Sequence, residues 1–172
     1  MNHRFSFVAL ALATGALAVG AGAQGMAHID MKDATGKSVG VAMISAAKAG
    51  GVSIAIDFKG LPPGEHALHF HQTAKCEAPF TSAGGHFNPE GKKHGMENPE
   101  GPHAGDMKNF TVAADGTAKA TITNAHVTMG TGANSIYAGG GTALMIHAGP
   151  DDMKSDPAGD AGARIACGLV VK

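Results

Sequence analysis

The chain has 172 residues with 13 basic and 14 acidic side chains, a formal net charge of −1 and no tryptophan. This length suits a single domain with a substantial core. The near-neutral charge provides no bulk attraction to nucleic acid or to a membrane surface, and aromatic residues, at 5%, are too scarce for base-stacking or sugar-binding platforms.

The first 23 residues have the layout of a secretory signal peptide. A short basic start precedes an apolar run over 5–19, and small residues then form an A-x-A-like cleavage site before Gln24. A membrane anchor fits less well, because the apolar run is shorter than the roughly 20 residues that cross a bilayer. We therefore expect a signal peptide over 1–23 and a mature domain over 24–172, with no membrane contact after cleavage.

The mature chain has the pattern of short strands separated by turns. Over 52–58, apolar residues alternate with polar or small ones, as in a half-buried strand. Asp115 and Gly116 form a typical hairpin turn. Similar runs lie near 26–32, 39–45, 65–71, 110–114, 117–123, 141–147 and 165–171. Eight strands without a convincing helix predict an all-β fold, an eight-stranded antiparallel sandwich or closed barrel.

Two long segments, 72–109 and 148–163, interrupt this rhythm. Between Gly84 and Asp106 there are six glycines and three prolines, which disfavour regular structure. Loops of this length in a compact domain are usually functional or disordered. Candidate metal ligands within the first loop favour a functional role.

Those candidates are histidines and one aspartate that recur at the spacing of a metal site. The pair His69 and His71 is followed by four further residues at short intervals, His86, His94, His103 and Asp106. Imidazole nitrogens suit copper and zinc, and a set of three histidines and one aspartate completes a tetrahedral zinc site. Four other histidines lack a partner at ligand spacing or have the wrong strand parity, so we expect ordinary structural or exposed roles for His3, His28, His66 and His126.

Strand parity predicts where three of the imidazoles point. If Leu68 and Phe70 face the core, His69 and His71 leave the other face of the same strand. The same parity places Leu144 and Ile146 in the core and His147 outside. Rigid strands would then present three imidazoles beneath the long loop.

The two cysteines, Cys76 and Cys167, both lie in the mature chain. An exported protein meets an oxidising compartment, so a disulfide is the expected state. Free thiols or metal-bound thiolates are the alternative, but a lone, widely spaced pair lacks the C-x-x-C spacing of thiolate sites.

The stretch EHALHFHQTAKCEAPFTSAGGHFNPEGKKHGMENPEGPHAGD and the C-terminal GTALMIHAGPDDMKSDPAGDAGARIACGLVV resemble the copper, zinc superoxide dismutases, specifically their bacterial secreted branch. The resemblance covers the chain from about Gly36 onward. It implies a Greek-key β-barrel with two long functional loops, a periplasmic location, and one copper and one zinc per subunit. Bacterial relatives occur as monomers and as dimers, so a homodimer is one of two open alternatives.

The resemblance also implies the ligand sets. Copper is assigned to His69, His71, His86 and His147, and zinc to His86, His94, His103 and Asp106. His86 is counted twice because in the family its ring bridges the two metals. Asp151 occupies the position of a carboxylate that hydrogen-bonds a copper histidine and a zinc histidine, here His69 and His94.

The implied activity is dismutation of superoxide to dioxygen and hydrogen peroxide by a redox-cycling copper, with His86 as ligand and proton donor. The R-x-A-C sequence gives Arg164 the position of the family's anion-attracting guanidinium, tied to the loop of the Cys76–Cys167 disulfide. Lysines that could add to its field are Lys75, Lys92, Lys93 and Lys154. The alternative is a periplasmic copper and zinc carrier without turnover, which needs the histidines but not Arg164.

Two departures from the family pattern concern packing and subunit contacts rather than ligands. Met153 stands where bacterial relatives commonly have tyrosine, and the segment from Met129 to Gly141 matches only loosely.

Overall fold

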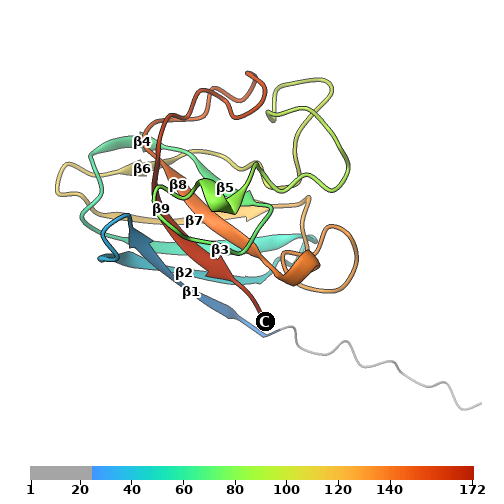
Figure 1. The fold of residues 1–172 in the computed structure, drawn as a ribbon, viewed down its shortest axis with the longest axis horizontal. Coiled ribbons are helices and arrows are strands. Elements are labelled where there is room, and N and C mark those ends of the chain that lie inside the picture. The colour runs from blue at the N-terminus through green and yellow to red at the C-terminus, as the bar shows by residue number, and fades with distance from the viewer. Residues whose placement is uncertain (1–24) are drawn as a thin grey trace, which may run out of the picture.

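The computed structural model describes residues 25–172, so the expected signal peptide over 1–23 lies outside the described residues. The regular secondary structure of the described chain is almost entirely antiparallel strand, which confirms the predicted all-β fold (Figure 1). Its strands are β1 (Ala27–Asp33), β2 (Ser38–Ala46), β3 (Val52–Phe58), β4 (Gly64–His66), β5 (Leu68–His71), β6 (Phe110–Val112), β7 (Ala118–Asn124), β8 (Thr142–His147) and β9 (Arg164–Val170). Two single 3₁₀ turns, η1 (Thr81–Ala83) and η2 (Ala138–Gly140), lie in the connections.

Seven strands form one curled sheet in the order β5-β8-β9-β1-β2-β3-β7, and β4 pairs with β6 alone. The strand predicted over 65–71 is therefore two strands. The break falls at Ala67, whose N–H bonds to the carbonyl of Gly149 and whose carbonyl accepts from the N–H of His147. With β4 and β5 counted as one interrupted strand, the order matches the eight predicted strands.

The inner face of the curled sheet holds the hydrophobic core. Ile54 and Phe58 of β3 are fully buried, as their alternation predicts, and the ring of Phe58 packs edge-on against that of Phe110 at 5.6 Å between centroids. A smaller apolar cluster lies on the outer face of β8 and β9, where Met145 and Cys167 pack beneath Phe80 of the disulfide loop. That loop thus covers strand surface that would otherwise be exposed.

The predicted turn at Asp115 and Gly116 is present. The N–H of Ala113 bonds to the carbonyl of Thr117 at 2.8 Å, and Gly116 has a φ of 80°, a left-handed conformation that glycine adopts without strain. The strands on either side, β6 and β7, belong to separate ladders, so this turn joins the two sheets rather than closing a regular hairpin.

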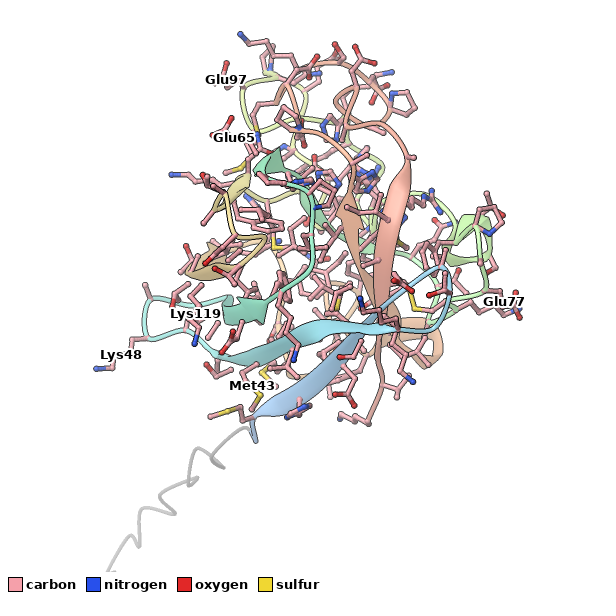
Figure 2. All side chains as sticks on the ribbon, turned by 90° about the vertical axis from the view of Figure 1, so that its left-hand side faces the viewer. Met43, Lys48, Glu65, Glu77, Glu97 and Lys119 are labelled. Carbon is pink, nitrogen blue, oxygen red and sulfur yellow. A yellow bond between two sulfur atoms is a disulfide. The ribbon has the colours of Figure 1, made fainter. Side chains whose placement is uncertain are left out.

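The two long loops gather at one end of the molecule. In Figure 1 the segments after β5 and after β8 rise together above the sheet. Figure 2 shows Glu97 at the outer end of this loop region and Met43 of β2 at the opposite end of the molecule. Among the residues that the structure describes, no helix is long and apolar enough to cross a membrane.

Candidate metal centre

Two sets of potential ligand atoms converge where the loops meet the sheet, and every member is buried. One set comprises His69, His71, His86 and His147, and the other comprises His86, His94, His103 and Asp106. Within each set the ligand atoms lie within 4.8 Å of one another. The structure therefore brings together all seven residues predicted as ligands, with His86 in both sets.

Strands position the three histidines of the first set that are not shared. In the pairing of β5 with β8, His69 lies opposite Met145 and His71 opposite Ala143. Leu68 and the other inward residues of these strands belong to the main core, so the histidines leave the outer face, as parity predicts. They are nevertheless buried, because the long loops cover them.

The ring orientation of His71 and His147 is set by backbone carbonyls. Nδ1 of His71 lies 2.9 Å from the carbonyl oxygen of Gly84, and Nδ1 of His147 lies 3.3 Å from that of Gly162. A carbonyl can only accept, so each Nδ1 carries the proton and each Nε2 carries a lone pair. The two Nε2 atoms lie 3.3 Å apart, an arrangement of facing lone pairs that a cation between them would stabilise.

The other two members of this set have unpartnered nitrogens. Nδ1 of His69 and Nε2 of His86 are buried without a hydrogen-bond partner among the described residues. Buried polar atoms are rarely left unsatisfied, because the cost is about 1–3 kcal/mol each. The first set therefore fits a bound metal ion, and four imidazole nitrogens suit copper.

The second set is organised by Asp106. Its Oδ1 lies 2.9 Å from Nδ1 of His86, 3.1 Å from Nδ1 of His94 and 3.4 Å from Nδ1 of His103. Ligand atoms about 2.0–2.1 Å from a tetrahedral zinc stand about 3.3 Å from one another, so these separations fit that ion.

Two backbone N–H groups fix the orientation of the Asp106 carboxylate. Its Oδ2 accepts hydrogen bonds from the N–H groups of Gly95 and His103, both at 2.9 Å, so that Oδ1 faces the three imidazoles. Nδ1 of His103 has no well-aligned hydrogen-bond partner, although it is buried. The second set thus also fits a cation, with one carboxylate and three nitrogens as ligands.

Burial keeps most of these imidazoles neutral. Burial, followed by repulsion from neighbouring imidazoles, lowers the pKa of His71 to about 2 and that of His147 to about 3. Burial likewise lowers the pKa of His86 to about 4, even though Asp106 opposes the shift. At neutral pH each of these rings is therefore neutral and keeps one nitrogen lone pair for a metal.

His94 and Asp106 behave differently because they contact opposite charges. Burial lowers the pKa of His94, but the carboxylates of Asp106 and Asp151 outweigh it and raise the pKa to about 9. Burial raises the pKa of Asp106, but contacts with three imidazoles outweigh it and hold the pKa well below its usual range. Without metal, His94 is therefore protonated at neutral pH, and a metal at its Nδ1 would displace that proton.

Asp151 spans the two sets, as the resemblance predicts. Its Oδ2 lies 2.8 Å from Nε2 of His69, and its Oδ1 lies 3.0 Å from Nε2 of His94. Both contacts are fully buried. One carboxylate thus orients a histidine of each set. Asp152 points its side chain to its own turn instead, accepting from the N–H groups of Lys154 and Ser155.

Arg164 is half-buried beside the first set. Its Nη1 donates to the carbonyl of Phe80 and its Nη2 to the carbonyl of Gly84, both at 2.6 Å. Gly84 also accepts from His71, so one loop holds both side chains. This loop is tethered to β9 by the disulfide between Cys76 and Cys167, which confirms the predicted pairing.

The lysines predicted to assist Arg164 are mostly neutralised by neighbours. Lys92 pairs with Glu90 at 2.7 Å, Lys93 with Asp156 at 3.3 Å, and Lys154 with Glu97 at 2.9 Å. Lys75 makes no ion pair within residues 25–172. Of the four candidates, it is the one whose charge is not compensated by a carboxylate in contact.

His66 has a larger structural role than its sequence position indicates. It is buried, with Nδ1 2.8 Å from the carbonyl oxygen of His147 and Nε2 2.8 Å from that of Pro62. It thus supports the backbone of a residue in the first set without joining that set. Parity relative to His69 could not reveal this, because the break at Ala67 places His66 on a different strand.

Comparison with known proteins gives consistent matches. A family model described as copper/zinc superoxide dismutase (SODC) matches residues 38–170. "Superoxide dismutase [Cu-Zn] 2" of Aquifex aeolicus is 50% identical over 147 residues, covering 84% of this chain and 85% of the relative. "Superoxide dismutase [Cu-Zn]" of Caulobacter vibrioides is 40% identical over 144 residues, covering 81% and 82%.

Solved structures agree with these matches. The Cu/Zn superoxide dismutase from Brucella abortus superposes with a TM-score of 0.69 at 30% identity, covering 85% of this chain and 99% of that one. A SOD-like protein from Bacillus subtilis superposes with a TM-score of 0.81 at 35% identity, covering 84% and 97%.

Proposed function

Because the chain belongs to the copper/zinc superoxide dismutase family, we propose roles for its residues in metal binding, proton transfer and attraction of the substrate. The protein is a superoxide dismutase that converts superoxide to dioxygen and hydrogen peroxide, with copper and zinc as cofactors. In this proposal copper is held by His69, His71, His86 and His147, and zinc by His86, His94, His103 and Asp106. When bound, copper supplies the one-electron chemistry, accepting an electron from one superoxide and returning it to the next.

The observation that carries the proposal is the position of His86. Its Nδ1 faces Asp106 at 2.9 Å, while its Nε2 is buried and unpartnered within the first set. One ring would thus offer one nitrogen to each metal position. A proton taken up by Nε2 of His86 in one half of the cycle can be given to the departing peroxide in the other, and the second proton of hydrogen peroxide comes from solvent, so that His86 acts as ligand and general acid.

The second role falls to Arg164. Superoxide is an anion, and a guanidinium beside the first set attracts it and orients it through charge-assisted hydrogen bonds. The carbonyls of Phe80 and Gly84 hold this guanidinium in one place, so that little freedom is lost when the substrate arrives. Arg164 is a catalytic residue in this proposal, because it contacts the substrate.

The roles of zinc and Asp151 are structural. A closed set of three histidines and one carboxylate leaves no open position for substrate, so zinc orients His86 and stabilises the loop. Asp151 fixes the rings of His69 and His94, each by its Nε2, so that their Nδ1 atoms face the metal positions.

We also propose that the protein acts outside the cytoplasm, in the periplasm. Support comes from the signal-peptide pattern over 1–23 and from the disulfide, which oxidising compartments favour.

The direct test is superoxide consumption by metal-loaded protein, with copper and zinc measured on the same sample. Turnover that scales with copper content supports the proposal. Stoichiometric metal binding without turnover would instead favour a metal carrier, the alternative class that this ligand set could serve.

A further inference from the structure

We propose that Asn109 positions Asp151, and that through Asp151 it controls how firmly zinc is held. The amide Nδ2 of Asn109 donates to the backbone carbonyl of Asp151 at 2.9 Å, and the backbone N–H of Asp151 donates to Oδ1 of Asn109, also at 2.9 Å. This inference rests on the proposed assignment of zinc to His94 and of copper to His69.

The chemistry of this contact requires an amide. A carboxamide presents one donor and one acceptor side by side, so it matches the N–H and C=O of a single residue as a neighbouring strand would. An aspartate of the same shape would keep the acceptor and lose the donor. Asn109 directly precedes β6 (Phe110–Val112), so its amide is carried by the barrel.

Two other hydrogen bonds between the segments 148–163 and 72–109 do not hold the backbone of Asp151. The carbonyl of Met153 accepts from the N–H of Glu97 at 3.0 Å, and Asp156 accepts from the N–H of His94 at 2.8 Å. Both bonds join one long loop to another. Asn109, the last residue of the segment 72–109, instead ties the residue that spans the two metal sets to the start of β6.

Once the backbone of Asp151 is held, its carboxylate has little room to move. Gly159, with a φ of +64°, packs so closely that a Cβ atom there would overlap Oδ1 of Asp151 and crowd the ring of His94. With Oδ1 on His94 and Oδ2 on His69, a shift of the backbone would therefore displace both rings. Partners that orient a metal ligand typically change metal affinity by about 10- to 100-fold when removed.

The test is the rate at which a chelator removes zinc from the metal-loaded protein. We expect Asn109→Ala to lose zinc about tenfold faster than wild type. The matched control is Asn134→Ala, which removes an amide bonded to Glu90 and to the carbonyl of His126 and should leave the rate unchanged. An equal rate in wild type and Asn109→Ala would overturn the inference.

A double-mutant cycle shows whether Asn109 acts through Asp151. If it does, the double variant Asn109→Ala, Asp151→Ala should lose zinc no faster than Asp151→Ala alone. Additive effects would mean that Asn109 acts by general loop stability and would contradict the proposal. If Asn109→Ala does not fold, Asn109→Asp tests the same point, since it keeps the shape and replaces the donor with a charged carboxylate oxygen that cannot bond to the Asp151 carbonyl.

Hydrogen exchange in the metal-free protein separates this inference from the proposed function. The amide proton of Asp151 should exchange faster in Asn109→Ala than in wild type, and unchanged exchange would refute the positioning of Asp151 by Asn109. A wild type that binds no zinc would refute the metal assignment. Equal zinc retention by wild type and Asn109→Ala would refute only the role of Asn109.

Discussion

Arg164 lies directly opposite His147 because the ladder between β8 and β9 shifts by one residue. Met145 pairs with Cys167 and Ile146 with Ala166, but His147 pairs with Arg164. The extra residue, Ile165, packs against the main core beside Ala166, so two successive residues face inward. This bulge turns Arg164 to the outer face, where the histidines lie, and strict alternation would have pointed it into the core.

That placement leads to a prediction for Arg164 itself. Because it is not a metal ligand, Arg164→Ala should keep copper and zinc near wild-type content while turnover falls about tenfold, at the lower end of electrostatic steering effects. Arg164→Glu should fall further, since the sign of the local field is reversed. The measurements are superoxide consumption and metal content of the same samples.

Ionic strength provides the control for this prediction. Salt screens exposed charges over about 10 Å at 0.1 M and about 3 Å at 1 M, so the wild-type rate should fall as salt is added and the Arg164→Ala rate should fall less. Wild-type turnover in fully metallated Arg164→Glu would be incompatible with steering by this residue.

The two metal sets should respond differently to loss of Asp106 and loss of His86. Asp106→Ala removes a residue of the second set alone, so zinc occupancy should drop while copper stays largely bound. His86→Ala should disturb both metals, because His86 belongs to both sets. Metal analysis after dialysis against a weak chelator measures this, and loss of one metal only in His86→Ala would argue against a shared ligand.

The metal-free protein should lose stability in mild acid. The pKa values of His71, His147 and His86 are lowered to about 2, about 3 and about 4 in the folded state. Below pH 6.5 the unfolded chain binds protons that the folded chain does not, so the free energy of unfolding falls as the pH drops toward 4, by up to about 1.4 kcal/mol per pH unit for each histidine.

His94 contributes in the opposite direction. Its pKa is raised to about 9, so its contribution is complete below pH 6.5 and is lost as the pH rises toward 9. Urea denaturation of metal-free protein should therefore show its highest midpoint near pH 6.5. A midpoint that rises steadily between pH 6 and pH 4 would contradict these shifts.

Export and disulfide formation predict a specific mass. Protein isolated from the periplasm should lack residues 1–23 and carry two fewer hydrogens than the reduced chain, because Cys76 is bonded to Cys167. Replacing both cysteines by serine should lower the free energy of unfolding by about 4–5 kcal/mol in the chain-entropy view of a loop this long. A retained N-terminus, or two alkylatable thiols in native protein, would count against export through an oxidising compartment.

Local pattern predicted much of this architecture. Alternation alone located β3, and parity alone placed His69, His71 and His147 on the outer face, since both depend only on neighbours in sequence. The pairing of Arg164 with His147 depends on a bulge, which is a property of two paired strands and not of one local pattern, and the family resemblance indicated only that Arg164 lies near the copper ligands. Alternation of β9 would have placed Arg164 in the core.

Two other features could not be predicted from the sequence, because they also depend on contacts between distant segments. The break at Ala67 arises from bonds to Gly149 and His147, which belong to a distant segment. The hydrogen bonds between Asn109 and Asp151 likewise join residues 42 positions apart and leave no local pattern in the sequence. Such contacts become visible only when the loops are placed on the sheet.

In the proposed site one imidazole, that of His86, joins the two metal positions. The most direct test of this bridge is electron paramagnetic resonance of oxidised wild-type protein loaded with copper at both positions, with two coppers per chain verified by metal analysis. A bridging ring should couple the two ions magnetically, so that the signal of isolated copper is lost, and His86→Ala at matched copper content should restore it. Two independent, uncoupled copper signals in the verified dicopper wild type would mean that no ring bridges the two ions.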